Sequence, residues 1–221
     1  YIREIPGKYT ASFFVNTDLE NNQIASFYTG AMADAARFTL TGLPRDEVDY
    51  LVISPNDPAA MRKLTDECVS MGIPYLFDPS QQVARNPHDD LRIGVENAHA
   101  VFCNEYEFDL LIKHTGLSAA QIEGLVQLLV ITRGENGATV KAEGREYLIP
   151  VVPAARIADP TGVGDAFRGG FLRGYRLGLD LQTCGQMGAL SAAYCLEQNG
   201  PSNHFYTKQE YITRYRTFFD D

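Results

Sequence analysis

The sequence predicts an α/β fold in which a mostly parallel sheet is covered by helices on both faces. Between residues 49 and 132, short apolar runs alternate with segments whose apolar positions recur at helical spacing. Such alternation is typical of strand–helix–strand units, in which the crossover helix makes neighbouring strands parallel. The chain has 221 residues, of which 45% are hydrophobic and 21% charged, and this suits one large globular domain.

The first 30 residues differ from the rest of the chain. Two runs rich in aromatic and β-branched residues, at 10–16 and 23–28, flank a polar stretch at 18–22. This pattern predicts a β-hairpin closed by a turn. We therefore expect a small β unit with its connections over residues 1–30 and the α/β core over residues 31–221.

The elements of the core follow from local signals. Asp57 is suited to cap a helix, Pro58 to occupy its first position and Gly72 to end it. Short apolar runs predict strands at residues 49–54, 73–77, 98–103, 127–132, 138–141 and 146–149, the last two forming a hairpin. Helical spacing predicts further helices that begin near residue 105 and that span 118–125, 164–177, 181–197 and 207–218. His88 falls outside these segments and is expected in a solvated loop.

Composition and missing motifs exclude several classes of function. The formal net charge is −9 and no block of basic residues occurs, so neither a nucleic acid nor an anionic membrane is an expected partner. The longest apolar run, at 125–131, is far too short to cross a bilayer. The absence of Gly-x-x-x-x-Gly-Lys-Ser/Thr excludes a P-loop nucleotide hydrolase. Four widely spaced cysteines without a Cys-x-x-Cys pair indicate free thiols, and so a cytoplasmic protein.

The most informative stretch is residues 157–167, Ile-Ala-Asp-Pro-Thr-Gly-Val-Gly-Asp-Ala-Phe. Gly162 and Gly164 let the backbone turn its N–H groups outward where a helix is expected to begin. Unpaired N–H groups at a helix start attract an anion, and Asp165 places a carboxylate beside them. Donors next to a proton acceptor suit phosphoryl transfer to a hydroxyl. A purely structural role stays open on these residues alone, because acidic residues favour the first turn of any helix.

The string from Asp159 to Phe167 resembles the C-terminal signature of the ribokinase-like (PfkB) family of sugar and nucleoside kinases, usually Asp-Thr-x-Gly-Ala-Gly-Asp. Pro160 stands where Thr is usual and Val163 where Ala is usual, but both glycines and the final aspartate are retained. The resemblance implies a ribokinase-like three-layer sandwich with a small β lid, and ATP and Mg²⁺ as cofactors.

The resemblance also implies catalytic roles. Asp165 is the expected base, which accepts the proton of the acceptor hydroxyl. The N–H groups of Gly162, Val163 and Gly164 are expected to hold the charge that builds on the transferred phosphoryl group. Such donors usually contribute a few kcal/mol each to lowering the barrier.

Two further motifs follow expected strands. Asn104 and Glu107 form an Asn-x-x-Glu pattern, which by itself is ordinary helix capping. In the family this pattern helps to organise Mg²⁺ and phosphate, so Glu107 is expected to hold Mg²⁺ through water, with Asn104 beside it. Thr132, Gly134 and Gly137 match the family's Thr-x-Gly-x-x-Gly stretch, which lies along the nucleotide.

Near the end of the chain, a helical segment rich in small residues, at 189–195, leads into an Asn-Gly-Pro turn. By itself such a segment indicates tight helix packing. The resemblance implies that Ser191 and Gly200 lie near the adenine and that Asp159 contributes to a K⁺ site.

A complete member of the family is longer than this chain. It begins with further strands and a Gly-Gly motif for the acceptor, and nothing similar precedes Tyr9. We therefore expect the chain to lack roughly the first two strand–helix units. The hairpin at 10–28 resembles the lid strands of the family, and a homodimer through the lid is expected.

The expected reaction transfers the γ-phosphoryl group of ATP to a primary hydroxyl of a small nucleoside or sugar. Residues 13–24 and 78–82 look like a bacterial branch usually labelled adenosine kinase or PfkB carbohydrate kinase, so adenosine is the preferred acceptor. The aromatic residues of the hairpin could stack on a base or form a packed face. The alternatives are a non-catalytic nucleotide or metabolite sensor, and an inert fragment that pairs through an exposed sheet edge.

Overall fold

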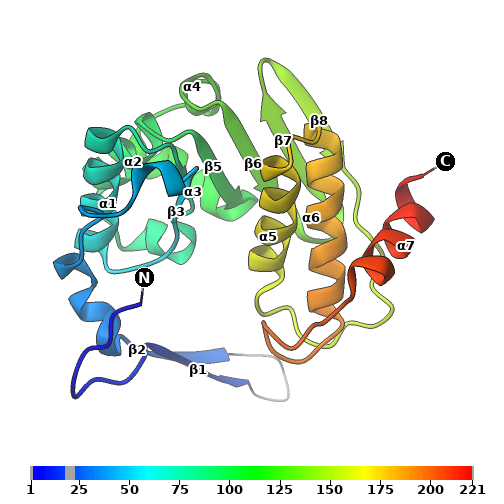
Figure 1. The fold of residues 1–221 in the computed structure, drawn as a ribbon, viewed down its shortest axis with the longest axis horizontal. Helices are drawn as coiled ribbons and strands as arrows, with labels where there is room; N and C mark the ends of the chain where they lie inside the picture. The colour runs from blue at the N-terminus through cyan, green and yellow to red at the C-terminus, as the bar shows by residue number, and fades with distance from the viewer. Residues whose placement is uncertain (1, 18–22, 221) are drawn as a thin grey trace.

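The computed structural model describes residues 2–17 and 23–220 (Figure 1). Near the N-terminus, β1 (Ser12–Thr17) and β2 (Gln23–Tyr28) pair antiparallel as a separate two-stranded sheet that projects from the body. The two strands of the predicted hairpin are therefore confirmed. The predicted turn at 18–22 lies outside the described residues.

The aromatic side chains of this hairpin face solvent. Phe13 and Phe14 on β1, and Phe27 and Tyr28 on β2, are all exposed. The alternative in which they form a packed face is therefore wrong for the described chain, and the rings are free to meet another molecule.

The predicted central sheet is confirmed as a mixed, mostly parallel one. Its strand order follows the chain: β3 (Leu51–Ile53), β4 (Tyr75–Phe77), β5 (Ala100–Asn104), β6 (Leu128–Thr132), β7 (Ala138–Ala142) and β8 (Arg145–Ile149). The first four strands are parallel, and β7 and β8 continue the sheet antiparallel. The carboxyl ends of the parallel strands therefore share one edge, which is where such sheets bind ligands.

Helices cover both faces of the sheet (Figure 1). One layer contains α1 (Pro58–Met71), α2 (His88–Glu96), α3 (Glu105–Thr115) and α4 (Ala119–Leu125), and the other contains α5 (Val163–Arg176), α6 (Leu181–Leu196) and α7 (Lys208–Phe219). Short 3₁₀ segments lie at Gly30–Arg37, Arg45–Glu47, Ser80–Ala84 and Gly134–Asn136.

Strand residues alternate between the two cores, as a pleated strand with both faces buried requires. On β5, Val101 and Cys103 pack in the core beneath α1 to α4, whereas Ala100 and Phe102 pack in the core beneath α5 and α6. The ring of Phe102 meets the edge of the Phe171 ring with centroids 5.3 Å apart. This contact packs α5 against the sheet.

The predicted limits of the first core helix are confirmed. The Asp57 side chain accepts a hydrogen bond from the Ala60 amide at 3.1 Å, and Pro58 occupies the first turn. Gly72 ends the helix in the left-handed conformation, with φ of 63°.

The placement of His88 in a loop is wrong. His88 is the first residue of α2, and its ring stacks on that of His114 with centroids 4.4 Å apart. Leu91 and Val95, four residues apart on this helix, are fully buried. That spacing is helical, but α2 has only nine residues, and so short a segment gives a weak periodic signal.

The cysteine prediction holds in the structure. Cys68, Cys103, Cys184 and Cys195 are all buried and free. Across residues 2–17 and 23–220, no helix has both the length and the apolar character needed to cross a bilayer.

Candidate active site

The turn before α5 requires glycine at its first position. Gly162 caps the helix with φ of 80° and ψ of 1°, a left-handed conformation that residues with a Cβ atom seldom adopt. A Cβ atom at this position would also lie 2.5 Å from the Cβ atom of Pro201. The turn is therefore pressed against the loop that follows α6.

The amides of this turn are only partly free. The Val163 N–H donates to the Pro160 carbonyl at 3.3 Å and closes the turn. Within the described chain, the amides of Gly162, Gly164 and Asp165 donate to no protein acceptor. This differs from the sequence prediction, which included the Val163 amide among the donors to the anion.

The carboxylate of Asp165 faces solvent beside these amides. It occupies the third position of α5, and its side chain is 76% exposed. Arg168, one turn later, donates from Nη2 to Asp165 Oδ1 at 2.6 Å. The same guanidinium lies with Nε 2.7 Å from Asp78 Oδ2. One arginine thus joins α5 to the carboxyl end of β4.

Asp78 is fully buried immediately after β4. Its carboxylate forms an ion pair with Arg168, and neither carboxylate oxygen has a hydrogen-bond partner at normal angles among the described residues. Burial raises the pKa of Asp78 to about 7, with Arg168 opposing the rise and the Glu107 and Asp165 carboxylates adding to it. The sequence analysis identified neither Asp78 nor Arg168 as site residues.

The raised pKa of Asp78 predicts a pH dependence of stability. The pKa of this carboxyl is 3.8 in its unperturbed state and about 7 in the folded chain. Between these values the folded state binds one more proton than the unfolded state, so the free energy of unfolding falls as pH rises from about 4 to about 7. Asp78→Asn is expected to flatten this part of the pH profile in urea unfolding. An unchanged slope in the variant contradicts the assignment.

Asn104 and Glu107 lie where β5 meets α3, as predicted. The Asn104 side chain accepts from the Glu107 amide at 2.8 Å, and Glu107 Oε2 accepts from the Asn104 amide at 2.8 Å. The Ser80 hydroxyl donates to Glu107 Oε1 at 3.2 Å. This capping box holds a half-buried carboxylate at the sheet edge, close to Asp78.

The described residues contain no group of three or more His, Cys, Asp or Glu side chains that could bind a metal ion by themselves. Mg²⁺ is commonly held by one or two carboxylates together with water and substrate phosphates. The single carboxylate of Glu107 fits that mode.

Thr132 ends β6 directly beside Asn104 in the sheet register. The loop that follows contains Gly134 and Gly137, both with positive φ, of 55° and 83°. A Cβ atom at Gly137 would overlap the carbonyl oxygen of Ile149, whereas one at Gly134 would have nothing within 4 Å. The fold by itself accounts for Gly137, while Gly134 lies open at the sheet edge.

Asp159 and Gly200 join the two loops that flank the turn. The Asp159 carboxylate accepts hydrogen bonds from the Thr161 and Gly200 amides, both at 2.9 Å. These bonds, that of Thr161 above all, lower the pKa of Asp159. The K⁺ role of Asp159 stays a prediction, as does contact of Gly200 with adenine.

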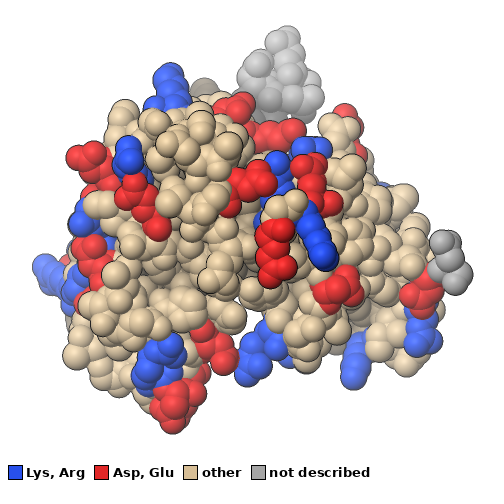
Figure 2. Space-filling model, turned by 90° about the horizontal axis from the view of Figure 1, so that it is seen from above, with Lys and Arg blue, Asp and Glu red and all other residues tan. Residues whose placement is uncertain are grey.

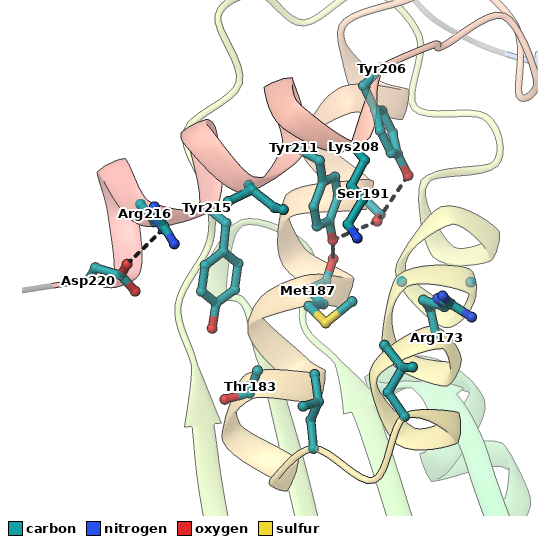
Figure 3. Close-up of a pocket in the computed structure, with 15 residues that line it drawn as sticks. Arg173, Thr183, Met187, Ser191, Tyr206, Lys208, Tyr211, Tyr215, Arg216 and Asp220 are labelled. Atoms are coloured by element: carbon teal, nitrogen blue, oxygen red, sulfur yellow. Dashed lines mark hydrogen bonds and ion pairs between the residues drawn. The ribbon is translucent and has the colours of Figure 1, made fainter.

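Ser191 lies elsewhere, on the wall of a cavity of about 840 Å³ between α5, α6 and α7 (Figure 3). It is buried where α6 packs closely against Gly170 of α5, and its hydroxyl lies 3.2 Å from that of Tyr211. No residue of the Gly162 turn lines this cavity. The structure gives Ser191 a packing role, and its contact with adenine stays a prediction.

The face drawn in Figure 2 carries basic and acidic side chains intermixed, without a continuous basic area.

Residues 1–208 match the sequence model of the pfkB family of carbohydrate kinases. The chain belongs to this family. Members of the pfkB family are phosphotransferases that act on hydroxyl groups.

Two solved nucleoside kinases share the fold over nearly all of this chain. The nucleoside kinase of Burkholderia thailandensis, in complex with inosine, is 36% identical, with a TM-score of 0.94 over 99% of this chain and 73% of that one. The structure of the Methanocaldococcus jannaschii nucleoside kinase is 26% identical, with a TM-score of 0.88 over 96% of this chain and 69% of that one. The ribokinase-like three-layer fold is thereby confirmed.

Curated relatives agree with the structural ones. The M. jannaschii nucleoside kinase is 28% identical over 205 residues, which are 93% of this chain and 67% of that protein. The cytidine kinase of Thermococcus kodakarensis is 34% identical over 166 residues, covering 72% of this chain and 59% of that protein. The chain thus spans about two thirds or less of the length of these relatives.

Proposed function

We propose that this chain carries the nucleotide-binding and catalytic part of a cytoplasmic nucleoside kinase, which transfers the γ-phosphoryl group of ATP to a primary hydroxyl. The observation that carries the proposal is the exposed Asp165 carboxylate beside the unpaired amides at the start of α5. Similarity to the B. thailandensis nucleoside kinase over 99% of the chain favours a nucleoside acceptor over a sugar.

In the proposed reaction, the acceptor oxygen attacks the γ-phosphorus, the bond from that phosphorus to ADP breaks, and the hydroxyl proton passes to the Asp165 carboxylate. A carboxylate is a weak base, which suffices when the transition state is loose and the proton moves late. The free amides at Gly162 and Gly164 face the charge on the transferred group. Glu107 would hold Mg²⁺ through water, and the bound ion would neutralise charge on the phosphates.

The nucleotide is proposed to lie along the sheet edge. Thr132 and Gly134 would contact its phosphate side, and Gly200 would border the adenine. Support comes from their position at or next to the carboxyl end of β6 and next to the Gly162 turn.

The acceptor is proposed to lie beneath the hairpin. A cavity of about 320 Å³ between the hairpin and the body is lined by residues that include Phe13, Phe27, Met32, Gln81 and Arg85. Aromatic faces stack on nucleoside bases, so Phe13 and Phe27 suit a nucleoside, with adenosine as our preferred acceptor. We also propose that the exposed hairpin mediates a homodimer.

A product screen tests the function. The protein is incubated with ATP and Mg²⁺ together with adenosine, inosine, cytidine, ribose or fructose 6-phosphate, and products are identified by mass spectrometry. We expect a nucleoside monophosphate and ADP in equal amounts. Phosphorylated sugar alone would identify a sugar kinase, and ATP binding without any product would identify a sensor. Repeating the assay in K⁺ and in Na⁺ tests the proposed K⁺ site at Asp159.

The role of Glu107 is tested against a second capping box in the same chain. Glu107→Gln and Glu210→Gln each keep a side chain that can complete the capping box but remove a first-turn charge, so each is expected to lower stability by only about 0.3–1 kcal/mol. Only Glu107→Gln is expected to raise the Mg²⁺ concentration needed for half-maximal activity, by about tenfold or more. Equal Mg²⁺ requirements in the two variants would leave Glu107 with capping alone.

A further inference from the structure

The guanidinium of Arg168 lies in the middle of the candidate active site. Its Nε lies 2.7 Å from Asp78 Oδ2, and its Nη2 donates to Asp165 Oδ1 at 2.6 Å. A Cβ atom built on Gly164 would lie 3.5 Å from Arg168 Nη1, so the guanidinium packs against the turn whose amides are free. The side chain is 19% exposed and so remains in contact with solvent.

The two carboxylates that contact Arg168 differ in freedom. The Asp78 side chain is 1% exposed and cannot turn to water, whereas the Asp165 side chain is 76% exposed. A buried carboxylate without hydrogen bonds is costly to separate from its counter-ion. Exchange of a surface ion-pair partner costs little. The Asp78 contact is therefore the anchor, and the Asp165 contact is the one that can be exchanged.

The carboxylates of the site repel the phosphates of ATP, and a positively charged side chain would offset part of this repulsion. Asp78, Glu107 and Asp165 bring three carboxylates to the edge where the phosphates of ATP are proposed to bind. Backbone amides supply only partial positive charges. Arg168 supplies a full one, on a planar group that can donate two hydrogen bonds to phosphate oxygens.

We propose that Arg168 is a phosphate-binding catalytic residue, which Asp78 holds in place and which exchanges Asp165 for the oxygens of the transferred phosphoryl group when ATP binds. The inference rests on the proposed function. The exchange frees Asp165 Oδ1 to accept the proton of the acceptor hydroxyl. Binding of the nucleotide therefore uncovers the base.

Kinetics of Arg168 variants test the role. Arg168→Gln is expected to lower kcat at least about a hundredfold, because a donor to the transition-state charge is lost, while the KM for the nucleoside changes less than about threefold. Arg168→Lys keeps the charge but not the paired donors, and is expected to recover about tenfold of the lost rate. Arg173→Gln, at a position of α5 that lines the cavity between α5, α6 and α7, is the matched control and is expected to retain wild-type kcat.

A double variant separates phosphate binding from mere neutralisation of Asp78. Asp78→Asn/Arg168→Gln removes both charges of the buried pair. If Arg168 serves only to neutralise Asp78, the double variant recovers activity relative to Arg168→Gln. If Arg168 binds phosphate, the double variant stays as inactive as Arg168→Gln. Recovery to within about threefold of wild type overturns the proposal.

Nucleotide binding without turnover keeps this test independent of the proposed function. Calorimetric titration with ADP and with a non-hydrolysable ATP analogue is carried out at pH 8, where the Asp78 carboxyl is ionised. Arg168→Gln is expected to weaken analogue binding by about tenfold or more and ADP binding by less, because the contact is to the terminal phosphoryl group. Unchanged analogue affinity overturns the proposal even if the chain proves to be a sensor. If Arg168→Gln does not fold by circular dichroism, Arg168→Lys takes its place, and wild-type kcat and affinity in that variant overturn the proposal.

Discussion

Asp165→Asn is expected to lower turnover at least about a hundredfold, with the KM values for ATP and nucleoside changed by less than about threefold. An asparagine side-chain oxygen can still accept the hydrogen bond from Arg168 that Asp165 Oδ1 accepts at 2.6 Å, so the geometry of the site is retained. The amide cannot take up the proton of the acceptor hydroxyl. The loss therefore falls on kcat, because the missing interaction is made only as the hydroxyl reacts.

The measurement is steady-state formation of nucleoside monophosphate, quantified by chromatography. Asp89→Asn is the control, because Asp89 is also an exposed acid in the first turn of a helix, α2. Both substitutions remove a charge that favours the helix dipole, worth about 0.3–1 kcal/mol of stability. Near-normal turnover of Asp165→Asn would remove Asp165 from the reaction and leave it as a first-turn acid like Asp89.

Gly137→Ala is expected to lower the free energy of unfolding by at least about 3 kcal/mol, from backbone strain together with a steric overlap. The residue has φ of 83° and ψ of −136°, a region that is nearly exclusive to glycine. Its added Cβ atom would overlap the Ile149 carbonyl oxygen at the end of β8. Relief would require β8 to move away from the start of β7, and the two strands are hydrogen-bonded.

Urea unfolding monitored by circular dichroism measures this loss, and Gly144→Ala is the matched control. Gly144, in the tight connection between β7 and β8, also has a positive φ, of 70°, but an added Cβ atom there has nothing within 4 Å. Its substitution is expected to lower stability by about 1–2 kcal/mol, the cost of a left-handed alanine. Equal losses in the two variants would mean that the contact with Ile149 contributes nothing.

Much of the fold could be predicted because its signals are local. The caps at Asp57 and Gly72 are set by neighbours in sequence, and the structure confirms them. The helix at His88–Glu96 was missed because it is short and its stabilising contacts are buried tertiary ones. Short segments depend on packing more than on periodicity.

The candidate site was predictable only in part for a related reason. Asp165 and the glycines of the turn could be predicted because they lie within a few residues of one another and form a recognisable motif. Asp78 and Arg168 belong to no such motif, since each is an ordinary charged residue until the fold brings β4 and α5 together. Conversely, Ser191 fits the pattern of a small-residue helix, and the structure uses it in the contact between α5 and α6.

Pro201 packs against the turn at Gly162, which we propose faces the phosphates. The ring presses on Gly162, and next to it the Gly200 amide ties the same loop to Asp159. In the proposed arrangement, the loop after α6 borders the adenine and also packs on the turn whose amides face the phosphates, so a shift of this loop is expected to move both contacts with the nucleotide. Substitutions in the loop after α6 are therefore expected to change both the selectivity for the base of the phosphate donor and the rate of phosphoryl transfer.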